Sequence, residues 1–373
     1  MRKRSAYRDE DDVRVRAGRG SRPRTRRRPA HESAPGAFVV SIDRGRYGCL
    51  VGESDSSQGD SSQGDSSQGD SGRDGSGRDG SGRGDRMVTA MKARELGHNS
   101  IVVGDRVSLA GDTSGTPGTL ARIVRVAERT SVLRRSPDDT DPSERVVVAN
   151  AQQMVIVCAL ADPEPKTRFL DRCLVAAYDA GLSPLLVLTK SDLAQPRKLR
   201  ALYRPLDLPV LTTRQPLPAV TLSRLRSALA GRVSVLIGQS GVGKSTLVND
   251  LIPDADRAVG TVNAVTGKGR HTSSSAIALR LPSTVRGGHP PSSPPGGWLI
   301  DTPGVRGFGL GHVAPDRVAE AFGDLADGIA GCPPGCDHLS EGCALDEWAA
   351  SRHAEARLDS LRRLLRSVSG AVA

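Results

Sequence analysis

A glycine-rich segment that ends in Lys-Ser-Thr has the clearest chemistry in this sequence. It runs Gly-Gln-Ser-Gly-Val-Gly-Lys-Ser-Thr from Gly238 to Thr246 and fits the pattern G-x-x-x-x-G-K-[ST]. The glycines allow backbone N–H groups to close around phosphate oxygens, and Lys244 adds a positive charge. The hydroxyl of Ser245 is a ligand that Mg²⁺ takes in such loops. The segment predicts a nucleotide-phosphate site made of Gly238, Gln239, Ser240, Gly241, Val242, Gly243, Lys244, Ser245 and Thr246.

Flanking residues predict the elements that this loop needs. An apolar run over 232–237 is suited to a buried strand before the loop, and Leu247 to Leu251 continue as a helix after it. The N-terminus of a helix at that point favours a bound anion. A chance glycine-rich turn is the alternative interpretation, and the strand, loop and helix in register argue against it.

A second motif, Thr189-Lys190-Ser191-Asp192, fits the [NT]-K-x-D box that recognises guanine. The Asp192 carboxylate can accept hydrogen bonds from N1–H and the 2-amino group of guanine, which adenine does not offer, and the Lys190 stem can cover the base. An apolar run over 184–188 places the box at the carboxyl end of a strand, where ligands bind in α/β folds. For the box alone, an ordinary capped turn between a strand and a helix is the alternative.

The order of these two motifs is reversed. In ordinary GTPases the base-reading box follows the phosphate loop by a long stretch of sequence, but here Asp192 precedes Gly238 by 46 positions. Together the two motifs predict a P-loop GTPase whose chain has been circularly permuted.

Two later segments are suited to Mg²⁺ and the γ-phosphate. Asp301-Thr-Pro-Gly304 follows a third apolar run, so Asp301 can hold the metal through water and the Gly304 amide can contact the γ-phosphate. A strand that ends in a Pro-Gly turn is the alternative here. Between the motifs, a basic loop over 266–273 offers Thr272 as the metal-sensing hydroxyl, with Ser273 as the second choice.

Three cysteines and a histidine cluster near the C-terminus as Cys332-x3-Cys336-x-His338-x4-Cys343. Three thiolates and an imidazole within twelve residues form a closed tetrahedral set for Zn²⁺. Because no position remains for a metal-bound water, we expect one structural zinc ion. A disulfide with a free thiol is the alternative. The flanking segments 314–329 and 352–368 are predicted to be helices.

Composition and charge limit the remaining possibilities. The 373 residues allow two or three domains. No apolar run approaches the roughly 20 residues that span a bilayer, so a cytoplasmic protein without membrane contact is expected.

Residues 1–35 hold twelve Arg or Lys and five acidic residues, which supply +7 of the net charge of +10. This arm is predicted to be disordered and suits a polyanion such as RNA, with a merely solubilising tail as the alternative. The low-complexity insertion 53–86 is also predicted to be disordered.

Five short β-like segments surround that insertion and predict a small barrel, an OB-fold, with an SH3-like barrel as the alternative. Arg125, Arg129, Arg134 and Arg135 are expected to give it a positive face. The predicted fold class is thus a multidomain α/β chain. It has an arm (1–35), an N-terminal OB-fold β-barrel (36–148), a circularly permuted P-loop GTPase domain (149–308) and a C-terminal helical zinc-binding domain (309–373).

This combination resembles the bacterial small-ribosomal-subunit biogenesis GTPases known as RsgA (YjeQ). Further matching stretches are Val103-Gly-Asp-Arg-Val107, Val148-Ala-Asn-Ala151, Leu170-Asp-Arg-Cys-Leu174 and Gly269-Arg-His-Thr272. The resemblance implies GTP hydrolysis with Mg²⁺, stimulated by the small ribosomal subunit, and binding to its rRNA late in assembly. A monomer is expected. The zinc spacings are each one residue tighter than in many relatives, and the stretch after Val210 lacks the usual base-contacting loop.

The resemblance also bears on catalysis. Val305 stands where many GTPases place a water-orienting glutamine, so hydrolysis is expected to be slow or to depend on another group. In the family, the histidine that matches His271 is proposed to position the attacking water. His271 and Lys244 are therefore the predicted catalytic residues. The alternatives are an rRNA-binding checkpoint protein without significant turnover and a permuted GTPase that acts on the large subunit.

Overall fold

The computed structural model describes residues 31, 33–52, 86–97, 100–136, 144–253, 255, 276–282, 297–302, 309–310, 313–340 and 342–368. The chain divides into two compact units, Met1–Ser33 and Ala34–Ala373, and the elements below belong to the second. The arm 1–35 and the insertion 53–86 lie almost wholly outside the described residues. Among the described residues, no helix is both long enough and apolar enough to cross a membrane.

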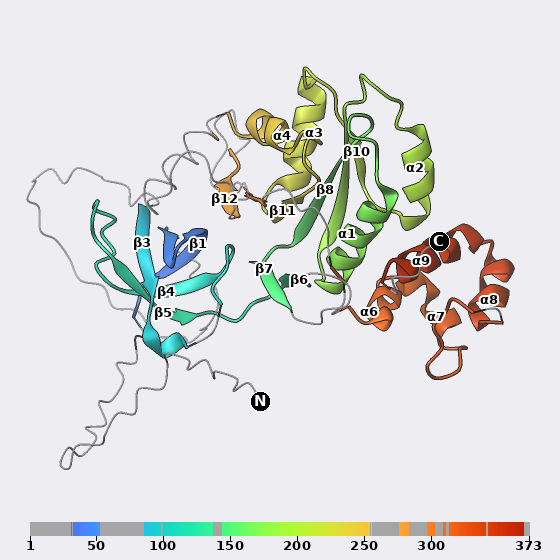
Figure 1. The fold of residues 1–373 in the computed structure, drawn as a ribbon, viewed down its shortest axis with the longest axis horizontal. Helices are drawn as coiled ribbons and strands as arrows, with labels where there is room; N and C mark the ends of the chain where they lie inside the picture. Colours follow the sequence, from blue (N-terminus) through green and yellow to red (C-terminus); the bar gives the residue numbers. More distant parts are fainter. Residues whose placement is uncertain are drawn as a thin grey trace, which may run out of the picture. The chain divides into compact units, whose positions relative to one another are not determined.

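Five strands close into a barrel near the N-terminus (Figure 1). They are β1 (Gly36–Asp43), β2 (Arg46–Val51), β3 (Arg86–Lys92), β4 (Arg106–Gly111) and β5 (Ala121–Val126). Their order is β1-β2-β3-β5-β4, and β4 pairs back onto β1. Alternate residues such as Val39, Leu109 and Ile123 are fully buried inside, as the two-residue period of a strand requires. This closed five-stranded topology confirms the predicted OB-fold.

A buried carboxylate joins the barrel to the chain that follows it. Asp105 is fully buried and accepts hydrogen bonds from the Val102 amide at 2.8 Å and from Arg129 Nε at 2.7 Å. A buried charge is stable only with such partners, so Arg129 is structural. Arg134 is likewise ion-paired with Glu144 at 3.0 Å. Two of the four arginines expected to form a free positive face are therefore paired within the chain.

A six-stranded, mostly parallel sheet forms the centre of the GTPase domain. It contains β8 (Gln153–Ala159), β9 (Ser183–Thr189), β10 (Val210–Thr212), β11 (Val233–Ile237), β12 (Ile277–Arg280) and β13 (Trp298–Asp301). The order is β10-β9-β8-β11-β13-β12, and only β12 pairs antiparallel. The central strands β8 and β11 are buried along their whole length, as expected for strands covered on both faces.

Helices cover both faces of this sheet. They are α1 (Thr167–Asp179), α2 (Arg197–Tyr203), η2 (Arg204–Leu206), α3 (Ala219–Leu229) and α4 (Lys244–Leu251). Alternate residues of β8 separate the two layers: Ile156 belongs to the core with α1 and α2, whereas Val157 belongs to the core with α3 and α4. The sheet thus holds the carboxyl ends of β9, β11 and β13 along one edge between two helical layers.

Two connections join the barrel to the GTPase sheet. β1 pairs with β12 at Ser41 and Ile277, and the Phe38 ring lies 5.0 Å from that of Trp298. The hairpin of β6 (Val132–Arg135) and β7 (Arg145–Ala149) lies between the domains in sequence and bridges to Val103 and Gly309. Gly104 has a φ of +94°, and a Cβ there would collide with the Ala149 carbonyl, so only glycine fits at this approach.

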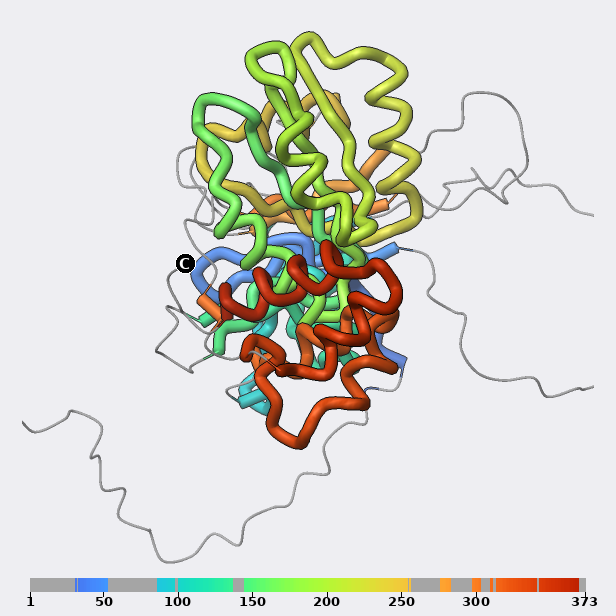
Figure 2. Tube along the Cα trace, turned by 90° about the vertical axis from the view of Figure 1, so that its right-hand side faces the viewer, coloured from blue at the N-terminus to red at the C-terminus, as the bar shows by residue number. Residues whose placement is uncertain are grey.

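The C-terminal domain is a group of short helices. They are α6 (Pro315–Glu320), η3 (Gly323–Leu325), α7 (Ala326–Ile329), α8 (Ala344–Arg352) and α9 (Glu355–Val368). The predicted helix over 314–329 is wrong in length, because the chain breaks at Ala321 and Phe322 between α6 and η3. α8 was not predicted; it ends at His353, whose φ is +54°. The helix α9 is dark red in Figure 2, and its buried leucines belong to the same core as α1.

Candidate nucleotide and metal sites

Glycines shape the loop between β11 and α4. Gly241 and Gly243 have φ values of +78° and +92°, in the left-handed region that favours glycine. At Gly238, a Cβ would lie 2.6 Å from the Val157 carbonyl oxygen, so a side chain does not fit beside β8. α4 begins at Lys244, and the next residue, Ser245, is exposed on its first turn. Backbone N–H groups at this helix start are available to an anion.

Lys244 and Asp301 provide opposite charges at this loop. Lys244 Nζ donates to the carbonyl oxygens of Gly238 at 2.7 Å and Gln239 at 3.0 Å. Burial lowers the pKa of Lys244, and the charge of Asp301 partly opposes that shift. Burial likewise raises the pKa of Asp301, against the effect of Lys244. The two groups therefore lie in a partly buried site, where a lower dielectric constant than that of water strengthens electrostatic interactions.

Asp301 also fits the predicted magnesium site. Its Oδ1 atom is buried and has no hydrogen-bond partner in the described part of the chain. A buried, unpaired carboxylate oxygen is costly unless a cation or an ordered water completes it. Carboxylate and hydroxyl oxygens are ligands that Mg²⁺ prefers, so Asp301 and the Ser245 hydroxyl suit this metal.

The threonine of the base-reading box bonds to the phosphate loop. Thr189 ends β9, is 6 % exposed, and donates from Oγ1 to the Val242 carbonyl at 2.6 Å. The same side chain lies about 3.8 Å from the position that a Cβ on Gly243 would take. Thr189 therefore points into the phosphate loop and joins the two motifs, although they lie 53 residues apart.

The rest of the box faces the next strand and the solvent. The Ser191 amide donates to the Thr213 carbonyl at 3.1 Å, and the Thr213 amide donates to Leu188 at 2.8 Å. Lys190 has a φ of +57°, and its Nζ bonds to the Asp162 carbonyl. Asp192 is exposed. Sequence reasoning gave no role to Asp162 or Thr213; they follow β8 and β10, the two parallel strands that flank β9, and this position is the signal for them.

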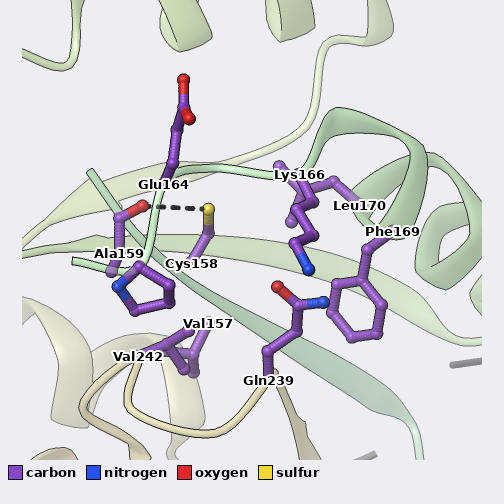
Figure 3. Close-up of a pocket in the computed structure, with 10 residues that line it drawn as sticks. Val157, Cys158, Ala159, Glu164, Lys166, Phe169, Leu170, Gln239 and Val242 are labelled. Carbon is purple, nitrogen blue, oxygen red and sulfur yellow. Dashed lines mark hydrogen bonds between the residues drawn. The ribbon is translucent and has the colours of Figure 1, made fainter. Parts of the chain in front are cut away.

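A small cavity lies beside the phosphate loop (Figure 3). It is lined by Val157, Cys158 and Ala159 of β8, Pro163, Glu164 and Lys166, Phe169 and Leu170 of α1, and Gln239 and Val242. The Gln239 side chain extends toward Lys166 and Phe169 in Figure 3. Burial raises the pKa of the Cys158 thiol to about 11, so it stays protonated at neutral pH and is a poor nucleophile.

Several predicted residues lie outside the described part of the chain. These are His271, Thr272, Ser273, Gly304 and Val305. Thr302, which precedes Gly304 by two positions in the sequence, is described. It is 2 % exposed and donates from Oγ1 to the Leu236 carbonyl at 2.8 Å. This bond, which sequence reasoning missed, fixes the residue after Asp301 to the strand that precedes the phosphate loop.

The predicted metal ligands of the C-terminal domain converge. The ligand atoms of Cys332, Cys336, His338 and Cys343 all lie within 4.8 Å of one another. Cys343 Sγ lies 3.5 Å from Cys332 Sγ, 3.8 Å from Cys336 Sγ and 3.7 Å from His338 Nδ1. Tetrahedral bonds of about 2.3 Å place sulfur atoms about 3.8 Å apart, so these separations suit a Cys3His metal site. The three thiols are free, which contradicts the disulfide alternative.

Charged neighbours hold the ligand loop in place. Asp337 Oδ1 accepts hydrogen bonds from the amides of Leu339 at 2.9 Å and Ser340 at 3.1 Å. Arg362 of α9 donates to the His338 carbonyl at 2.9 Å and to Asp346 at 2.7 Å. Through Arg362, α9 therefore holds the backbone of the ligand loop in place.

Comparison with known proteins finds GTPases among the relatives of this chain. The family model for RsgA GTPase matches residues 126–311. The small ribosomal subunit biogenesis GTPase RsgA of Pseudomonas syringae pv. tomato is 38% identical over 278 residues, 72% of this chain and 75% of that protein.

Two solved structures share the fold. YjeQ from Thermotoga maritima has a TM-score of 0.57 at 22% identity, covering 91% of this chain and 99% of that one. YloQ, described as a circularly permuted GTPase, has a TM-score of 0.57 at 19% identity, covering 93% and 99%. The permuted fold class predicted from the motif order is confirmed. On the strength of the sequence match to its curated relative, the chain belongs to the RsgA family of GTPases.

Proposed function

We propose that this chain binds GTP, hydrolyses it, and acts in assembly of the small ribosomal subunit through contact with its rRNA. The observation that carries the nucleotide part is the Thr189–Val242 hydrogen bond, which brings the base-reading box and the phosphate loop together. The subunit part rests on the curated relative, which is named a small ribosomal subunit biogenesis GTPase. The protein is proposed to act as a cytoplasmic monomer, with domain limits at 36–148, 149–308 and 309–373.

Each nucleotide group has a proposed partner. The loop from Gly238 to Thr246 and Lys244 bind the phosphates, while Lys190 and Asp192 bind the base. Ser245 and Asp301 would hold Mg²⁺, which would neutralise negative charge on the phosphates. Thr272 and Gly304 complete the metal and γ-phosphate contacts. Because Lys244 and the loop are preformed, binding of GTP needs no ribosomal partner.

Hydrolysis is proposed to need that partner. Lys244 stabilises negative charge on the phosphates but does not orient the attacking water. Val305 cannot do so, because its side chain has no hydrogen-bonding atom. His271 is therefore the proposed positioning group, and contact with the small subunit brings it into place.

Phosphate release with purified subunits tests this proposal. Small subunits should raise GTP turnover strongly, and large subunits should not. His271→Ala should keep GTP affinity and lose about 100-fold of the stimulated rate, the share typical of a group that handles the reacting water. Lys244→Ala should lose binding and hydrolysis together.

Three outcomes would contradict parts of the proposal. Equal stimulation by large subunits supports the large-subunit alternative. No turnover with either subunit supports the checkpoint alternative. Full stimulated activity in His271→Ala removes this histidine from the mechanism.

Guanine selectivity tests the role of Asp192. Asp192→Asn should weaken GTP binding about tenfold or more and favour xanthosine triphosphate, because an amide replaces the paired acceptors of the carboxylate. Equilibrium binding of GTP, ATP and xanthosine triphosphate measures the change. Asp207→Asn, a matched change outside the site, should bind GTP normally. Equal affinity of the native chain for ATP and GTP would refute the assignment.

The C-terminal cluster is proposed to hold one Zn²⁺ as a structural ion. Metal analysis of reduced protein should find one zinc per chain, and Cys336→Ser should lose it and make residues 313–368 sensitive to protease, because structural zinc contributes to folding. Cys158→Ala, a thiol outside the cluster, should retain the metal. Reduced native protein without zinc would show that the cluster has another role.

A further inference from the structure

A buried carboxylate on α1 binds the helix that supports the metal cluster. Asp171 is 3 % exposed and accepts hydrogen bonds from Arg363 Nε of α9 at 3.0 Å and from the Tyr203 hydroxyl at 3.1 Å. The Arg363 guanidinium also lies over the Tyr203 ring, 5.1 Å from its centroid. Arg363 therefore touches two segments of the GTPase domain, α1 and the end of α2.

The next residue on α1 makes a second bond to the same helix. Arg172 is 8 % exposed and donates from Nη1 to the Ser367 carbonyl at 2.9 Å. Ser367 lies in the last turn of α9, where carbonyl groups lack helical partners and attract cations. Asp171 and Arg172 thus bind α9 at two points, one through a side chain and one through the backbone.

The first turn of α1 and the phosphate loop line the same small cavity. Phe169 and Leu170 line the cavity of Figure 3 together with Gln239 and Val242 of that loop. Leu170 lies directly before Asp171, so a residue that lines the cavity beside the loop and a residue that bonds to α9 are neighbours on one helix. Just before α1, Pro163 lies 3.7 Å from the position of a Cβ on Gly241.

We infer that Asp171, Arg172 and Arg363 are positioning residues that couple the nucleotide site to the metal-cluster domain through α1. The inference rests on the proposed nucleotide site and adds its regulation. A packed helix moves as a unit, so a shift of its first turn when the phosphate loop binds nucleotide also shifts its contacts with α9. Thermodynamic linkage makes the effect reciprocal. The contact of α9 with α1 therefore alters nucleotide affinity by the same factor by which nucleotide alters the stability of that contact.

Hydrogen–deuterium exchange of the full chain tests this coupling. GDP or a non-hydrolysable GTP analogue should slow exchange of amides in 355–368 about fivefold, a typical coupling factor. Arg363→Gln should still bind nucleotide but lose this effect, and its nucleotide affinity should fall by a similar factor. Arg366→Gln, an exposed arginine on the same helix, should keep both. A merely structural role of Arg363 would change the exchange of α9 equally with and without nucleotide.

The native chain alone can decide against the coupling. If nucleotide slows exchange over 238–251 but leaves 355–368 unchanged, the coupling is absent and the nucleotide site stands. If neither segment responds, the proposed nucleotide site itself fails. Should Arg363→Gln not fold, Tyr203→Phe replaces it, since it removes only the hydroxyl, which bonds to Asp171 and, at 3.3 Å, to the Thr167 carbonyl of the same helix. Undiminished nucleotide protection of α9 in that variant would remove the Tyr203–Asp171 contact from the relay.

Discussion

The hydrogen bond from Thr189 Oγ1 to the Val242 carbonyl, at 2.6 Å, is the contact on which the proposed nucleotide site depends. It joins a base-reading box to a phosphate loop that comes later in the chain. The order of these motifs does not matter to the site, because β9 and β11 flank β8 in one parallel sheet and end at the same edge. A circular permutation changes the loop in which the chain begins and ends, and it keeps the strands in the same neighbouring positions. The reversed order of the motifs is therefore compatible with an ordinary arrangement of base, phosphates and metal.

Features set by short stretches of sequence could be predicted. The phosphate loop, the base box, the Cys3His cluster and the barrel strands each follow from residues close together in the chain. Contacts between distant residues could not be predicted, and Asp162, Thr213 and Thr302 were missed for this reason. The basic helix α9 shows the difference most clearly. Its arginines suggest a charged surface in sequence, yet Arg362 and Arg363 bond to Asp346 and Asp171, the latter 192 residues away.

Two modules are attached by different interactions to the sheet that carries the proposed nucleotide site. The barrel joins at the edge strand, where β1 pairs with β12 and Phe38 packs on Trp298. The C-terminal domain joins through α1, by an apolar core shared with the leucines of α9 and by buried charges, and not by a shared strand. A buried ion pair fixes geometry more than it adds stability compared with apolar packing. The C-terminal attachment therefore suits a contact that must hold α9 in one position on α1, the helix that begins beside the phosphate loop.

GDP affinity of Thr189→Val, compared with Thr189→Ser, tests most directly whether the two motifs work as one site. Valine keeps the shape of the side chain but leaves the Val242 carbonyl without its donor, which costs about 1–3 kcal/mol for a buried group. We expect GDP to bind about tenfold more weakly to Thr189→Val and nearly normally to Thr189→Ser, which keeps the hydroxyl. Native GDP affinity in a folded Thr189→Val variant would contradict the central claim, because the box and the loop would then bind nucleotide independently of their contact.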